Sequence, residues 1–154
     1  MRRNLTQNNM RQGRGLRENY SWFKNIPTRW MDNDVYGHVN NAVYYSYFDT
    51  AVNSYLIEAK VLDIQMGSQI GLVVETSCRF FESIAFPDLI EAGLRVARIG
   101  TSSVRYELGL FKGGEDLAVA EGHFVHVYVD RKTSRPQQLS PELKQALQTL
   151  LVQA

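Results

Sequence analysis

The chain has little cysteine and no long apolar run, and both shortages narrow the kind of protein it can be. Cys78 is the one cysteine in 154 residues, so no disulfide can form within the chain. At an alternating position it is more typical of a small buried side chain than of a nucleophile, and we expect a reducing, cytoplasmic location. No stretch approaches the ~18 apolar residues of a membrane span, and none follows the N-terminal arginines as in a secretory signal. We therefore expect a soluble protein.

Basic and acidic side chains are nearly balanced in number but unevenly placed. Residues 1–19 hold five arginines and one acid, Glu18, which leaves 12 basic and 15 acidic residues in the remainder. This mildly acidic remainder argues against a nucleic-acid-binding face. Residues 1–19 are also poor in apolar side chains, which predicts a disordered arm, with an Arg-rich transit peptide as the alternative. Residues 20–154 have the size of a single domain.

One long helix is predicted from Asn41 to Ala59, a stretch without proline or glycine. Apolar side chains recur there at steps of three or four residues, which is the helical period. Only a narrow polar stripe interrupts them, formed by Ser46, Asp49, Asn53 and Lys60. A helix that is apolar nearly all round is typically buried.

The other segments alternate apolar and polar side chains with the period of two that is typical of strands. We expect a short first strand over Trp22–Trp30, with Pro27 at a sheet edge or strand end. Four longer strands are expected in QIGLVVETSCRFF, DLIEAGLRVARI, SSVRYELGLF and LAVAEGHFVHVYV. In the first of these, one face is predicted to hold Ile70, Leu72, Val74, Cys78 and Phe80.

These elements have one obvious arrangement, in which an antiparallel sheet with short links curls around the apolar helix. We therefore predict an α+β fold of about five strands, one long central helix and a short C-terminal helix. The terminal helix begins with Ser140 as N-cap and Pro141 at its first position. Both faces of the last strand are partly apolar, which indicates contact with another subunit in a dimer or tetramer.

A cluster of polar residues precedes the long helix in DNDVYGHVNN, residues 32–41. Asparagine and aspartate cap helices, but a cluster of this length exceeds what capping requires. Gly37 allows a sharp turn or a close approach to a ligand, and the helix start presents unpaired N–H groups suited to a developing oxyanion. An ordinary aspartate, with a pKa near ~3.9, is too acidic for an ideal general base at pH 7. Chemistry led by Asp34 should therefore act on a reactive acyl group such as a thioester.

The stretch DNDVYGHVNNAVYYSYFD resembles the signature of hotdog-fold acyl-CoA thioesterases of the 4-hydroxybenzoyl-CoA thioesterase type, and the likeness covers roughly residues 20–150. The resemblance implies a hotdog fold and hydrolysis of an aryl- or fatty acyl-CoA, without a cofactor, since coenzyme A is part of the substrate. It places the catalytic carboxylate on Asp34 and the turn glycine on Gly37. It also places the polarising main-chain N–H groups around Asn40 and Asn41, and His38 in the pocket without a fixed role.

The same resemblance implies positions for substrate contacts. The segment RIGTSSV matches the family's turn beside coenzyme A, which suggests Gly100, Ser102 and Ser103. Basic residues after the last strand suit its phosphates, although a solvated loop explains them equally: Arg131, Lys132 and Arg135. Aromatic residues of the helix suit either an aryl or a fatty acyl group: Tyr44, Tyr45, Tyr47 and Phe48.

Several alternatives stay open. Asp49 is a secondary catalytic candidate, although a hydrogen-bonded pair with Asn53 explains it better, and Asp32 could replace Asp34 if the loop register differs. His123 and His126 should face opposite sides of a strand, so we expect no shared metal. The chain could instead bind acyl-CoA or acyl carrier protein without hydrolysis. A hotdog dehydratase is a third possibility, but it needs an aspartate paired with a histidine, and His38 is too close to Asp34 in sequence to make that pairing obvious.

Overall fold

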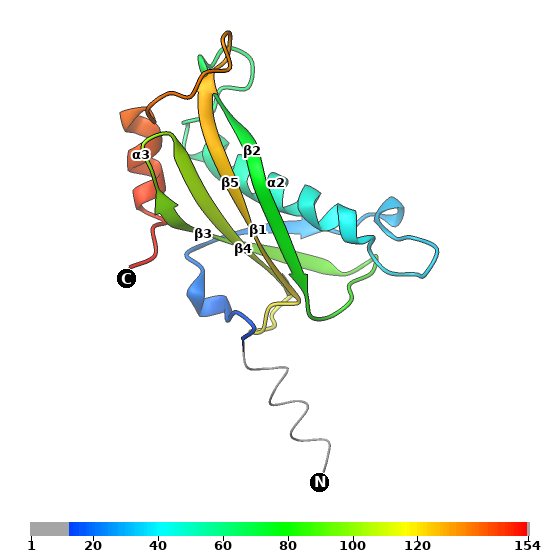
Figure 1. Ribbon diagram of the computed structural model, residues 1–154. Coiled ribbons are helices and arrows are strands. Elements are labelled where there is room, and N and C mark those ends of the chain that lie inside the picture. Colours follow the sequence, from blue (N-terminus) through cyan, green and yellow to red (C-terminus); the bar gives the residue numbers. More distant parts are fainter. Residues whose placement is uncertain (1–12, 154) are drawn as a thin grey trace.

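Five antiparallel strands form one curved sheet in the computed structural model, which describes residues 13–153 (Figure 1). The strands are β1 (Trp22–Pro27), β2 (Gln69–Phe80), β3 (Leu89–Ile99), β4 (Ser103–Lys112) and β5 (Ala120–Asp130). Their order across the sheet is β1-β3-β4-β5-β2, so β2 is a free edge of the described chain. Two short 3-10 turns, η1 (Arg17–Asn19) and η2 (Trp30–Asp32), flank β1. Of the predicted first strand, the part after Pro27 is therefore loop and η2.

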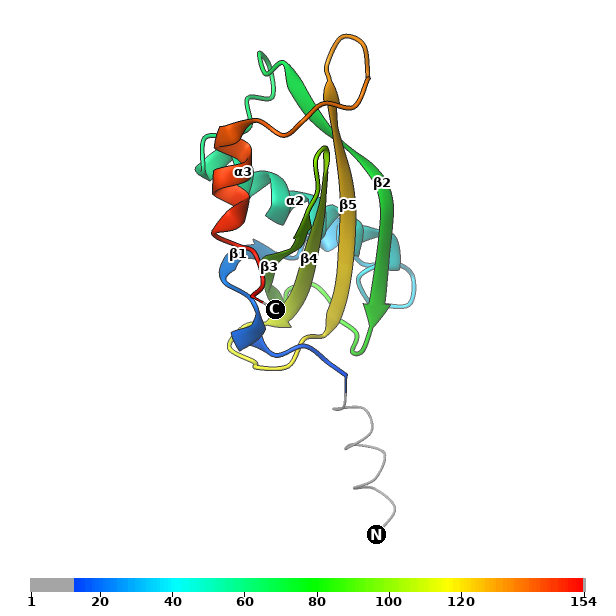
Figure 2. The same ribbon diagram turned by 60° about the vertical axis from the view of Figure 1, so that its left-hand side comes forward.

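The long helix α2 (Asn41–Glu58) crosses one face of the sheet (Figures 1 and 2). Its buried side is strongly aromatic and consists of Tyr44, Tyr47, Phe48, Ala51, Val52, Tyr55 and Leu56. The inward positions of β3 and β4 are fully buried opposite it. The prediction of a sheet curled around an apolar helix is confirmed, and this is the hotdog arrangement. The helix is not enclosed on all sides, since Ser46, Asp49 and Ile57 stay exposed on its outer side.

The terminal helix α3 (Pro141–Gln148) begins as its sequence predicts. The Ser140 Oγ accepts a hydrogen bond from the Leu143 N–H at 3.2 Å, and Pro141 occupies the first position. The Tyr55 hydroxyl of α2 donates to the carbonyl of Ala146 at 2.6 Å, so the two helices are tied together. Within residues 13–153, no helix is long and apolar enough to cross a membrane.

Strand β2 differs from its prediction because it contains a bulge. Val73 pairs with His126 and Glu75 pairs with Val125, so Val74 is left without a partner. Directly opposed residues share a face, and an extra residue reverses the alternation beyond it. Cys78 and Phe80 therefore lie on the face of Phe124, as predicted, and Thr76 lies there with them. The prediction that Ile70 and Leu72 share that face is wrong, since they pair with the outward Val129 and Val127.

The segment before β1 lies against the outer face of the sheet. Tyr20 packs on Gly93 and Gly109, which are cross-strand partners, and a Cβ at either glycine would come within 2.8 Å of the tyrosine. The two glycines therefore make room for an aromatic ring. Residues 13–19, which we predicted to belong to a disordered arm, follow a defined path here, whereas residues 1–12 lie outside the described residues.

Candidate active site

The polar cluster before α2 forms a tight loop anchored at both ends. The Asp34 N–H donates to the carbonyl of His38 at 2.9 Å, and the Gly37 N–H donates back to the carbonyl of Asp34 at 3.0 Å. Gly37 has φ +80°, a backbone conformation that glycine adopts without strain. The Val39 N–H donates to the carbonyl of Ile84 at 2.8 Å, which ties the loop to the segment after β2. The loop is thus held rigidly beside the start of the helix.

Asp34 and the start of α2 are joined through one side chain. The Asp34 carboxylate accepts hydrogen bonds from the Tyr36 N–H at 2.9 Å and from the Asn40 Nδ2 at 3.4 Å. The Oδ1 of Asn40 caps the helix by accepting from the Ala42 N–H at 2.9 Å. Among the described residues, the Asn41 N–H has no hydrogen-bond acceptor. The half-buried Asp34 carboxylate is therefore linked through Asn40 to the first turn of the helix.

Asp32 occupies a different environment two residues earlier. Its side chain is 1% exposed and accepts hydrogen bonds from the Tyr47 hydroxyl at 2.7 Å and from the Arg29 N–H and guanidinium at 2.9–3.0 Å. Burial works to raise the pKa of Asp32, but the hydrogen bonds from Tyr47 and Arg29 outweigh it and lower the pKa. A carboxylate so fully engaged fixes the base of the loop and has no free oxygen to offer a substrate.

A crevice of about 260 Å³ opens beside the helix start. It is lined by Val39, Asn41, Tyr44, Phe80, Phe81, Glu82 and Ser83. The ring of Tyr44 meets Phe80 edge to face at 4.8 Å, and burial raises the pKa of Tyr44 to about 12. We did not predict the wall formed by residues 80–83. The sequence does contain a sign of this wall in the pair Phe80-Phe81. Two consecutive strand residues cannot both face the core, so one of the two rings must lie outside it.

The predicted site residues fall into two groups, one at the Asp34 loop and the helix start, the other at the far end of the strands. Asp34, Gly37, Asn40 and Asn41 come together in one loop with His38, whose side chain is exposed. Tyr44 lines the crevice, and the half-buried Tyr45 packs its ring against Phe48 at 6.2 Å.

The predicted coenzyme A contacts lie at the other end of the strands. The Gly100 N–H donates to the Ser103 carbonyl across the β3–β4 turn, and Ser102 accepts from the Tyr128 N–H, both at 2.7 Å. A hollow beside this turn is lined by Gly100, Thr101 and Lys144. The eleven residues of β3 lie between this hollow and Asp88. The Asp88 carbonyl accepts a hydrogen bond from the N–H of Thr28, which precedes the Asp34 loop in the chain. A strand of that length spans roughly 35 Å, so one chain does not bring both groups together.

Basic residues after β5 differ in how freely they could meet an anion. The Arg131 guanidinium donates to the carbonyls of Ile64 and Gln65 at 2.6 and 2.9 Å, which commits it to the loop after α2. Lys132 and Arg135 are exposed. Lys132 is therefore a freer candidate for a phosphate contact than Arg131.

Asp49 lies two turns along α2 from the loop, on the exposed side of the helix. The Asn53 Nδ2 donates to the main-chain carbonyl of Asp49 at 2.9 Å, so the predicted pair uses the backbone and not the carboxylate. Burial by its neighbours raises the pKa of Asp49.

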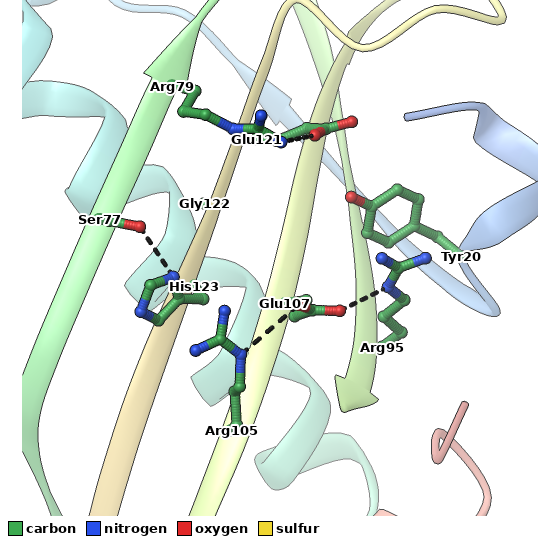
Figure 3. Close-up of a pocket in the computed structure, with 9 residues that line it drawn as sticks. All are labelled: Tyr20, Ser77, Arg79, Arg95, Arg105, Glu107, Glu121, Gly122 and His123. Atoms are coloured by element: carbon green, nitrogen blue, oxygen red, sulfur yellow. Dashed lines mark hydrogen bonds and ion pairs between the residues drawn. The ribbon is translucent and has the colours of Figure 1, made fainter. Parts of the chain in front are cut away.

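A second hollow, of about 310 Å³, lies on the opposite face of the sheet (Figure 3). His123 contacts Ser77 through Nδ1 at 2.7 Å and Glu75 through Nε2 at 2.6 Å, while Glu107 pairs with both Arg95 and Arg105. His126 points the other way, into the core, and its ring stacks on Phe124 at 5.7 Å. The two histidines therefore lie on opposite faces, and the charges of the outer hollow largely satisfy one another.

Comparisons with known proteins identify what this loop and helix belong to. The profile of the Thioesterase-like superfamily matches residues 28–147, whereas no curated protein matches the chain. The PA5185 protein from Pseudomonas aeruginosa strain PAO1 is 59% identical, with 92% of this chain and 99% of that chain covered and a TM-score of 0.89.

Two similar structures carry the name of an activity. A 1,4-dihydroxy-2-naphthoyl-CoA thioesterase from Synechocystis is 16% identical over 84% of this chain and 96% of its own, with a TM-score of 0.76. The BH1999 gentisyl-coenzyme A thioesterase is 20% identical over 82% of this chain and 99% of its own, with a TM-score of 0.74. At these identities the likeness shows the fold. The matched profile covers most of the chain, and the protein belongs to the Thioesterase-like superfamily.

Proposed function

We propose that this protein is an acyl-CoA thioesterase that hydrolyses an aryl- or fatty acyl-CoA to the free acid and coenzyme A. The observation that carries the proposal is the loop in which Asn40 joins the Asp34 carboxylate to the start of α2. Membership of the superfamily supports the reaction class. The reaction needs only water and the thioester, so we propose no cofactor.

In this proposal the Asn41 N–H polarises the thioester carbonyl. No described residue accepts from it, and it lies at a helix N-terminus, where the partial positive charge favours a developing oxyanion. Asp34 then acts in one of two ways. As nucleophile, its carboxylate oxygen bonds to the carbonyl carbon, the C–S bond breaks, and water later hydrolyses the mixed anhydride. As general base, it takes a proton from water while that water attacks the same carbon, and the C–S bond then breaks as the proton passes to the departing thiolate.

The acyl group is proposed to bind in the crevice beside α2. Its walls are formed by Tyr44, Phe80 and Phe81, which suit a flat aryl group or a short chain. The names of two structural neighbours, gentisyl-CoA and 1,4-dihydroxy-2-naphthoyl-CoA thioesterases, make aryl thioesters the first substrates to try.

The experiment that tests this function is a panel of aryl and fatty acyl-CoAs with release of free thiol as the readout. Asp34→Asn should lower kcat about 10²- to 10⁴-fold, the usual contribution of an acid–base or nucleophilic group. Asp63→Asn is the matched control, because the Asp63 carboxylate also accepts main-chain N–H bonds in an exposed turn. Full turnover by Asp34→Asn would remove the assignment of Asp34.

Two further results separate the remaining possibilities. Tight binding of acyl-CoA or acyl carrier protein without hydrolysis would replace the enzyme by a binding protein. Single turnover in ¹⁸O-water should place the label in Asp34 if it is the nucleophile and water attacks the aspartyl carbon of the anhydride, whereas a general base leaves the label only in the product acid.

A further inference from the structure

The N-terminal segment reaches the wall of the crevice through Arg14. The Arg14 side chain is 10% exposed, and its Nε and Nη2 donate to the Ala118 carbonyl at 2.9 and 2.6 Å. The same Nη2 pairs with the Glu82 carboxylate at 3.1 Å. The guanidinium also lies over the ring of Phe81, 5.5 Å from its centroid. One side chain thus contacts two consecutive residues of the wall.

A second arginine holds the same ring and is itself tied to the N-terminal segment. The Arg79 guanidinium lies 5.6 Å from the centroid of Phe81 and pairs with Glu121 at 2.9 Å (Figure 3). The other oxygen of Glu121 accepts a hydrogen bond from the Gly15 N–H. Residues 14 and 15 therefore hold Phe81 both directly and through Glu121 and Arg79.

Beyond Phe80, which pairs with Ala120 in the sheet, the backbone donors of the next two wall residues share one acceptor. The N–H groups of Phe81 and Glu82 both donate to the single carbonyl of Val119, at 2.8 and 3.1 Å. Both residues line the crevice opposite Asn41 and Tyr44. Each guanidinium over the ring attracts it electrostatically, so two such contacts add to this hold.

We propose that Arg14 is a positioning residue that sets the wall of the acyl crevice, so that the N-terminal segment determines which acyl groups bind. This inference rests on the proposed thioesterase function. Arg14 touches no reacting atom in it, and acts by holding Phe81 and Glu82 where they meet the acyl group.

The test compares Arg14→Ala with Arg17→Ala. Arg17 belongs to the same segment, but it pairs with Glu91 at 2.7 Å and lies over Phe23 and Phe111, and none of these lines the crevice. A wall that binds the acyl group equally in ground and transition states affects KM and not kcat. Arg14→Ala should therefore raise KM for the preferred acyl-CoA about five- to twentyfold, with kcat within about threefold and the inhibition constant of free CoA unchanged. Arg17→Ala should leave KM within about twofold, even if it lowers the Tm.

Several outcomes would overturn the proposal. Equal KM in wild type and Arg14→Ala would show that the wall does not depend on Arg14. A parallel rise in the inhibition constant of free CoA would make Arg14 a phosphate contact. Equal changes of KM in Arg14→Ala and Arg17→Ala would show that Arg14 contributes only to the general stability of the protein.

A readout without catalysis keeps this inference separate from the proposed function. Hydrogen exchange at the Phe81 and Glu82 amides should accelerate at least about fivefold in Arg14→Ala and not in Arg17→Ala. If the wild type hydrolyses no thioester but the exchange changes as expected, the proposed function fails and the positioning of the wall stands. If turnover is normal and exchange is unchanged, the positioning fails and the function stands.

Discussion

Two aspartates placed two residues apart show how much a local environment decides at the scale of one residue. Asp32 is buried and bonded by Tyr47 and Arg29, so its carboxylate belongs to the structure of the loop. Asp34 keeps a half-buried carboxylate that accepts from the Tyr36 N–H at 2.9 Å and, at a longer 3.4 Å, from Asn40. The motif places both residues in the loop, but the contacts with Arg29 and with Tyr47, fifteen positions later, separate their roles.

His126 gives a prediction about pH. Its ring is 5% exposed, neither ring nitrogen has a hydrogen-bond partner among the described residues, and burial lowers the pKa to about 4. An unfolded histidine has a pKa near ~6.5, so between these values the unfolded chain binds a proton that the folded chain does not. The free energy of unfolding should therefore be unaffected above pH 6.5 and fall by up to about 3 kcal/mol as the pH decreases to 4.

Urea unfolding of wild type and His126→Leu at several pH values checks this. The leucine variant should lose this part of the pH dependence, because it has no ring to protonate. Identical pH profiles in the two proteins would show that His126 is not its source.

At the scale of elements, the sequence pattern predicts those features that residues close in the chain determine. Helix α2 begins and ends within one residue of its prediction, because Asn40 caps it and its interior has neither glycine nor proline. The bulge at Val74 could not be predicted, since alternation looks the same on both sides and only pairing with β5 shows the extra residue. The support of the crevice wall by the N-terminal segment could not be predicted either, because Arg14 and Phe81 are distant in the sequence and meet only in the folded chain.

Substitutions at the caps of the two helices distinguish an effect on stability from an effect on function. Asn40→Ala and Ser140→Ala each remove a side chain that accepts from a first-turn N–H, of Ala42 and of Leu143 respectively. Each should lower the free energy of unfolding by about 1 kcal/mol. Only Asn40→Ala also removes the side chain that donates to the Asp34 carboxylate, and we expect it alone to lower kcat/KM, by about tenfold.

Chemical denaturation and steady-state kinetics on both variants measure these effects. Equal kinetics for the two would mean that Asn40 serves the helix alone and that its contact with Asp34 has no part in turnover.

At the scale of the whole molecule, two features of the described chain favour contact with a second copy. Strand β2 is a free edge, and Leu72, Val73 and Val74 along it are 42–59% exposed. The predicted coenzyme A contacts at Gly100–Ser103 also lie a strand's length from Asp34. A second copy placed against β2 would cover the edge, and a neighbouring chain could bring its own turn toward Asp34. We therefore retain the prediction of a homo-oligomer, with β2 as its contact.

A charge at the free edge tests this arrangement. Unpaired edge strands associate readily, and a lysine on such an edge opposes pairing. Val74→Lys should shift the mass measured by sedimentation from oligomer toward monomer and lower thioesterase activity with it. Ile64→Lys is the control, because Ile64 is 65% exposed in the loop after α2 and is not a residue of β2. A Val74→Lys protein that keeps its mass would place the contact elsewhere. A monomer with full activity would show that a single chain supplies every residue that the reaction needs.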